Sequence, residues 1–291
     1  MPSRTSVSVP PLWLFATLWS LREYPTRPRE WSWARKFATL RAAGFDGVMS
    51  PPIPALAARG DLRYLAISSV RSSGEIEPVL QAAKDLGALA IGIQLGRPET
   101  PLSVALRLAL RLRAVAQRLA LPFAIETHRA TFTELPETLA ALQAAYRESC
   151  GENLPVCLDY SHIALVRHLV PEVTWSTLTK QQPAALANAR QFHLRPFNAH
   201  HAQLPVLNAR GRRTPEYLAW RDQFAAPLLL HLRDRRTAEP VLAVAELGHA
   251  APAYGLSTHG DTWQDTRVVA RDLHALWKSP RVPASAPGTG S

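Results

Sequence analysis

Cysteine is scarce in this chain, and its scarcity excludes several kinds of architecture. Among the 291 residues only Cys150 and Cys157 are cysteines. Two closely spaced cysteines provide neither a disulfide framework nor the thiolate cage of a structural zinc site. We therefore expect a protein of the reducing cytoplasm.

Long apolar runs are missing as well. No stretch approaches the roughly 18 uninterrupted apolar residues of a membrane-spanning helix, so no membrane association is expected. The early apolar segment PPLWLFATLWSL is followed by REYPTRPREW without a small-residue cleavage site. It is therefore interpreted as a first strand rather than a secretion signal. The 47% hydrophobic content nevertheless supports one large core.

Positive charge is in excess but is not concentrated. The formal net charge is +10, and much of it is arginine spread along helical patterns such as RLALRLRAVAQR. Nucleic-acid-binding proteins usually gather such charge on one face. We therefore expect no nucleic-acid partner.

What is present is a regular alternation of short apolar runs with amphipathic segments. Eight runs are predicted as strands: 12–18, 47–50, 62–68, 88–94, 122–127, 155–160, 189–195 and 241–247. Continuously apolar strands that alternate with helices are typical of a parallel α/β fold. Eight such units favour a closed (β/α)8 TIM barrel, here a single domain over residues 1–278. Residues 279–291, rich in Pro, Ala, Ser and Gly, are expected to be a disordered C-terminal tail.

Four potential metal ligands end four of these runs. Glu126, Asp159, His193 and Glu246 close the segments PFAIE, VCLD, ARQFH and VLAVAE. The gaps fit a strand plus its return helix, which takes about 30 residues or more, with a long loop inserted in the last gap. A single carboxylate at a strand end is more often a helix cap or ion-pair partner, and a single histidine is more often a core residue. Four at successive strand ends favour a shared site for one divalent ion (Mn, Mg, Co or Zn) in the mouth of the barrel.

The motifs around these residues resemble a known family. I-E-T-H-R, C-L-D-Y-S-H, F-H-L-R and A-E-L-G-H-A-A-P-A-Y together look like the sugar phosphate isomerase/epimerase group. These proteins are xylose isomerase-like TIM barrels, a set that also includes ketose 3-epimerases and endonuclease IV-type enzymes. The resemblance runs from about residue 10 to 278. It implies that Glu126, Asp159, His193 and Glu246 are the metal ligands, and that Glu126 and Glu246 are also a pair of catalytic bases.

The same resemblance guides the choice of substrate-binding residues. It implies that His162, expected in the loop above its strand, hydrogen-bonds the substrate. The epimerases place an arginine six residues after the histidine ligand, but here that position is Ala199. Other candidates are therefore His128, Arg195, Asn198 and Gln203. The last two lie in segment 196–216, which shows no clean periodicity and is expected to be a long loop over the barrel mouth.

The resulting hypothesis is a metal-dependent isomerase or epimerase of a small carbohydrate or cyclitol. One Glu would abstract a proton next to a metal-bound carbonyl, and the other would return a proton. An inosose-type dehydratase begins with the same step and remains an alternative, as does a barrel that only binds ligands. An endonuclease IV-like repair enzyme is less favoured, because its zinc cluster needs early histidines and this chain has none before His128. No Gly-rich phosphate loop supports a phosphorylated substrate, and a homodimer is the default expectation for this fold.

Overall fold

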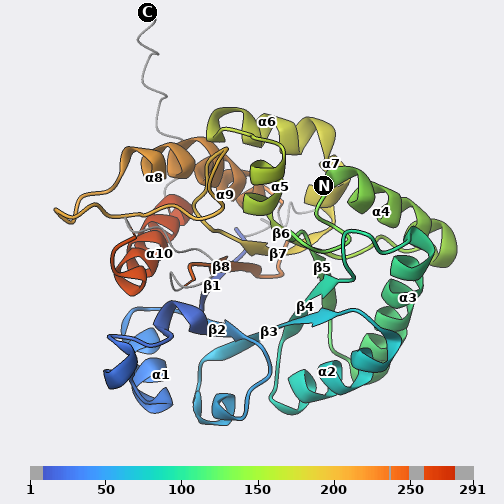
Figure 1. Ribbon diagram of the computed structural model, residues 1–291, viewed down its shortest axis with the longest axis horizontal. Helices are drawn as coiled ribbons and strands as arrows, with labels where there is room; N and C mark the ends of the chain where they lie inside the picture. The colour runs from blue at the N-terminus through green and yellow to red at the C-terminus, as the bar shows by residue number, and fades with distance from the viewer. Residues whose placement is uncertain (1–8, 236, 249–258, 279–291) are drawn as a thin grey trace, which may run out of the picture.

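Eight parallel strands close into a barrel in the computed structural model (Figure 1), which describes residues 9–235, 237–248 and 259–278. Each strand pairs with the next one in sequence, and β1 pairs with β8 to complete the ring. The strands are β1 (Leu12–Thr17), β2 (Gly47–Ser50), β3 (Arg63–Val70), β4 (Ala90–Leu95), β5 (Phe123–Glu126), β6 (Val156–Asp159), β7 (Ala189–His193) and β8 (Val241–Ala245). All eight predicted strands are present, so the predicted (β/α)8 barrel is confirmed.

Helices surround the barrel on its outer side (Figure 1). They are α1 (Trp33–Ala42), α2 (Ser73–Asp85), α3 (Leu102–Leu119), α4 (Pro136–Cys150), α5 (Tyr160–Val166), α6 (Pro171–Gln181), α7 (Pro183–Ala187), α8 (Pro215–Trp220), α9 (Ala226–Arg233) and α10 (Thr262–Lys278). A π-helical turn, Arg221–Ala225, joins α8 to α9. No helix in the described ranges is long and apolar enough to cross a membrane.

Two details differ from the sequence-based expectations. Helix α5 begins directly after β6, so His162 lies in the first turn of a helix and not in a loop. The segment expected to be an irregular loop contains an isolated antiparallel bridge between Leu207 and Arg213, and α8 begins inside it at Pro215. The predicted tail at 279–291 lies outside the described residues.

The barrel interior is mostly apolar in its lower layers, with the buried amide of Gln191 as an exception. Phe15, Met49, Leu65, Ile67 and Val244 form one buried cluster inside the ring. Because side chains alternate along a strand, the residues two positions further on share the inward direction and reach the C-terminal end of the barrel. On β8 that residue is Glu246, which directly follows the strand. The inward-facing carboxylates and imidazole at the C-terminal strand ends therefore lie in the mouth of the barrel, above a mostly apolar floor.

Candidate metal centre

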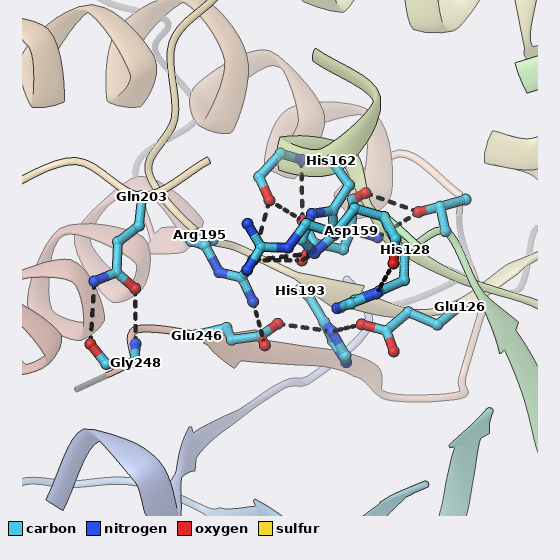
Figure 2. A network of polar contacts seen from close by, with 12 residues as sticks. Glu126, His128, Asp159, His162, His193, Arg195, Gln203, Glu246 and Gly248 are labelled. Carbon is cyan, nitrogen blue, oxygen red and sulfur yellow. Dashed lines mark hydrogen bonds and ion pairs between the residues drawn. The ribbon is translucent and has the colours of Figure 1, made fainter. Parts of the chain in front are cut away.

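The four predicted ligands converge at the C-terminal end of the barrel (Figure 2). Glu126, Asp159 and His193 are the last residues of β5, β6 and β7, and Glu246 directly follows β8. All four are buried, and one ligand atom of each lies within 4.8 Å of those of the others. Residues far apart in the sequence are thus brought to one point by the closure of the barrel.

Hydrogen bonds fix both the backbone and the carboxylate of Asp159. The Thr127 hydroxyl donates to the Asp159 carbonyl over 2.8 Å and accepts from the Asp159 N–H over 2.9 Å, which ties the end of β5 to that of β6. Asp159 is also the N-cap of α5: its Oδ1 accepts from the N–H of Ser161 at 2.9 Å and from the Ser161 hydroxyl at 2.6 Å. Capping thus uses one oxygen of Asp159 and leaves Oδ2 directed at the site.

The imidazole of His193 lies between two carboxylates. Its Nδ1 is 3.1 Å from Glu126 Oε1 and 2.8 Å from Glu246 Oε2, and its Nε2 is 3.2 Å from Cys157 Sγ. Burial disfavours the imidazolium, but Cys157, Glu246 and Glu126 outweigh it and raise the pKa of His193 well above 6.5. Burial also raises the pKa of Cys157 to about 12. The carboxylates therefore hold a proton on Nδ1 in the metal-free protein.

Arg195 brings a guanidinium into the same cluster (Figure 2). Its side chain is only 2% exposed, donates to Glu246 and lies 3.3 Å from Asp159 Oδ2. Burial opposes ionisation of Glu246, but Arg195 and His193 outweigh burial and lower its pKa to about 2. For Asp159, burial is the larger effect and raises the pKa in spite of Arg195. Arg195 is thus a fixed counter-ion of the candidate ligands.

His162 is a neutral neighbour of the cluster. Burial, followed by the positive charge of the Arg195 guanidinium, lowers its pKa well below 6.5. Arg195 Nη1 lies 3.1 Å from His162 Nε2, and a guanidinium can only donate, so Nε2 accepts and the ring proton is on Nδ1. That Nδ1 is buried and has no hydrogen-bond partner within the described part of the chain. The ring of His128 lies 4.1 Å away, centroid to centroid.

The residues present fit a divalent metal ion. Glu126 Oε2 is buried without a hydrogen bond in the described ranges, an unfavourable state that a cation would relieve. Three carboxylates and one imidazole form a hard, oxygen-rich donor set of the kind that Mn²⁺ and Mg²⁺ prefer. With one dication bound and His193 neutral, the guanidinium of Arg195 would balance the remaining negative charge.

The other two predicted substrate-binding residues make contacts within the protein. Gln203 donates to the Gly248 carbonyl over 3.1 Å and accepts from the Gly248 N–H over 2.7 Å, so it fixes the chain just after Glu246. Asn198 Oδ1 accepts from the N–H groups of His200 and His201 at 2.9 and 2.7 Å. Both therefore organise the backbone of the mouth.

Comparison with known proteins extends the description of the fold. No family model and no curated relative matches the chain. Among solved structures, a xylose isomerase-like TIM barrel protein from Mycobacterium smegmatis in complex with magnesium is 12% identical, with a TM-score of 0.56, covering 95% of this chain and all of that one. D-allulose 3-epimerase from Methylomonas sp. is 14% identical, with a TM-score of 0.56 and coverage of 93% and 98%.

A dehydratase has a similar structure. The probable 3-DHS dehydratase AsbF from Bacillus anthracis is 14% identical, with a TM-score of 0.55, and the match covers 89% of this chain and 99% of that one. Sequence identities this low show the fold alone, because one fold carries many chemistries. The closed eight-stranded barrel and these neighbours establish that the chain has the fold of the xylose isomerase-like TIM barrels.

Proposed function

We propose that the protein is a divalent-metal-dependent isomerase or epimerase of a small polyhydroxy ketone, either a sugar or a cyclitol. The observation that carries the proposal is the convergence of Glu126, Asp159, His193 and Glu246, all buried, with their ligand atoms within 4.8 Å of one another. Burying a carboxylate oxygen without a hydrogen bond lowers the stability of the folded state. Binding of a cation that the reaction requires would explain why such carboxylates are buried at this point.

Two carboxylates flank the same point from opposite sides. Glu126 and Glu246 approach His193 Nδ1 from β5 and from the end of β8. A divalent ion bound by the four residues would polarise a substrate carbonyl and stabilise the negative charge that develops when the adjacent proton leaves. One glutamate then removes that proton and the other delivers a proton to the neighbouring carbon or to the opposite face.

Arg195 and His162 complete this arrangement. By lowering the pKa of Glu246 to about 2, Arg195 and His193 keep that group ionised at neutral pH. His162 is uncharged and offers a buried Nδ1–H that has no acceptor among the described residues. We infer that this N–H donates to a substrate oxygen, which would orient the carbonyl relative to the two carboxylates.

Similar structures agree with a carbohydrate substrate. They include the D-allulose 3-epimerase and a 3-keto-D-glucoside 4-epimerase from E. coli, the latter 12% identical with a TM-score of 0.52. Both are named for the inversion of a sugar carbon, which begins by removing a proton next to a carbonyl. Removal of the same proton is also the first step of a dehydration. Identifying the product therefore distinguishes an isomerase or epimerase from a dehydratase.

The test is solvent hydrogen exchange. Protein loaded with Mn²⁺ in D₂O is expected to incorporate deuterium next to the carbonyl of ketoses such as D-fructose, D-allulose or inosose, and to lose this activity when a chelator removes the metal. Mass spectrometry and NMR measure the incorporation and identify the product. An unsaturated, dehydrated product would reassign the protein as a dehydratase. No exchange with any ketose or cyclitol tested would contradict the proposal.

A further inference from the structure

Two polar residues face the mouth from the side of the barrel that carries no predicted ligand. Ser69 and Gln94 lie near the ends of β3 and β4 and are direct partners in the parallel ladder. The Ser69 hydroxyl donates to Gln94 Oε1 over 2.9 Å. Ser69 is exposed and Gln94 partly exposed, unlike the buried residues below them.

The alternation along both strands directs this pair inward. Leu65 and Ile67 on β3 belong to the interior cluster, and Ser69 continues the same face. A Cβ on Gly92 of β4 would lie 3.6 Å from Gln191 Oε1 and 3.7 Å from Cys157 Sγ, so Gly92 faces the barrel interior. Gln94, two residues further along, shares that direction.

The pair also lies level with the candidate ligands. Ile93 on β4 is the ladder partner of Ile125 on β5, so the next residues, Gln94 and Glu126, are lateral neighbours on the inner face. Adjacent strands lie about 4.8 Å apart. Ser69, Gln94 and Glu126 therefore form one row along the inner wall of the barrel. Of these three, Glu126 is one of the four candidate metal ligands.

The other strand ends on this side offer no comparable group. Thr17, the last residue of β1, is fully buried, and its hydroxyl donates to the Leu247 carbonyl. Met49 on β2 is apolar and fully buried. Among the described inward-facing residues at the ends of β1 to β4, accessible hydrogen-bonding atoms thus come from Ser69 and Gln94.

We propose that Ser69 and Gln94 bind the hydroxyl groups of the substrate carbons beyond those held at the metal centre, and so set the length of polyol that the enzyme prefers. Because Gln94 Oε1 accepts from Ser69, the Gln94 Nε2–H₂ group is left to donate, while the Ser69 oxygen keeps lone pairs that accept. A sugar hydroxyl needs both a donor and an acceptor. The inference rests on the proposed function, since the carbonyl end of the substrate must lie beside Glu126.

The experiment compares variants over ketoses of graded length. Wild-type protein, Gln94→Leu, Ser69→Ala and the control Ser68→Ala are loaded with Mn²⁺ and assayed by deuterium exchange with D-fructose, D-ribulose and D-erythrulose. Ser68 is adjacent on β3 but faces away from the barrel interior, because its neighbours Ile67 and Ser69 face inward.

The wild type is expected to lose kcat/KM as hydroxyl-bearing carbons are removed. In Gln94→Leu and Ser69→Ala the KM for D-fructose is expected to rise about five- to tenfold, as for one lost hydrogen bond, with kcat changed less than about threefold. The dependence on chain length is expected to flatten in both variants and to persist in Ser68→Ala. Ser69 is exposed, so its variant guards against a folding defect in Gln94→Leu.

The experiment distinguishes a failure of the Ser69 and Gln94 assignment from a failure of the proposed function. If wild-type protein exchanges ketose hydrogens and both variants retain its KM and its chain-length dependence, the assignment of Ser69 and Gln94 is overturned while the proposed function stands. If the wild type exchanges none of the three ketoses but exchanges inosose, the assignment of Ser69 and Gln94 to a polyol chain is overturned and the proposed function stands. If it exchanges neither the ketoses nor inosose, both fall together.

Discussion

Replacing Glu126 or Glu246 by Gln is expected to reduce metal-dependent hydrogen exchange about 10²- to 10⁴-fold, the usual contribution of a positioned base. Each substitution keeps the size of the side chain but removes its charge and its ability to take a proton. Both glutamates approach the same His193 nitrogen, at 3.1 and 2.8 Å. Rates measured at saturating Mn²⁺ separate the loss of a base from weaker binding of the ion.

The matched control for these variants is Glu137→Gln. Glu137 is 68% exposed and pairs with Arg167 on the outer surface, so the same chemical change there is expected to leave the rate within about twofold. If Glu126→Gln or Glu246→Gln retained the wild-type rate on a substrate that the protein turns over, the mechanism with two glutamate bases would be wrong.

Replacing Arg195 by Met is expected to destabilise the metal-free protein by about 3–5 kcal/mol, the usual cost of leaving buried charges without their partner. Arg195 lies against Asp159 and Glu246, and all three side chains are at most 4% exposed. Bound metal would supply the missing positive charge, so saturating Mn²⁺ is expected to recover much of the loss. Urea unfolding with and without Mn²⁺ measures both quantities. The control is Arg118→Met, which removes a half-exposed ion pair between Arg118 on α3 and Glu77 on α2 and is expected to cost no more than about 1 kcal/mol.

The effect of Arg195 on stability also has a defined pH dependence. Because Arg195 and His193 lower the pKa of Glu246 from 4.5 to about 2, this stabilisation is complete above about pH 4.5 and is lost as the pH falls toward 2. The difference in unfolding free energy between wild type and Arg195→Met is therefore expected to shrink with acidification over that range. A difference that stayed constant from pH 7 to pH 3 would show that the guanidinium acts through packing instead of charge.

The barrel and its strand ends could be predicted because short apolar runs alternate regularly with amphipathic segments along the sequence. Each strand is an apolar run of four to eight residues, and the inward or outward direction of each side chain follows from its position along the run. Glu126, Asp159 and His193 end their strands, and such residues meet only if the sheet closes. The grouping of the four candidate ligands could therefore be predicted from the sequence once eight strand–helix units had been recognised.

The surroundings of the cluster were not predictable to the same degree. Helix α5 is only seven residues long, too short for a periodic signal, so the helical position of His162 was missed. The sequence places Arg195 on the same face as His193, but only the closed barrel shows its guanidinium against carboxylates from β6 and β8. Ser69 and Gln94 gave no signal because a single serine or glutamine in a strand is common, and their significance depends on the register between β3, β4 and β5.

The most direct test of the metal centre is a calorimetric titration of Mn²⁺ into metal-free protein at pH 7, repeated in two buffers of different ionisation enthalpy. Because the pKa of His193 lies well above 6.5 without metal, Nδ1 must lose its proton when the ion binds. We predict about one Mn²⁺ per chain, release of about one proton per ion, affinity that rises with pH, and much weaker binding by Glu246→Gln. If the wild-type protein bound no Mn²⁺, or if Glu246→Gln bound it equally well, the four strand-end residues would not be a metal site. If the wild-type protein bound close to three Zn²⁺ ions per chain, the result would instead indicate a nuclease-like cluster.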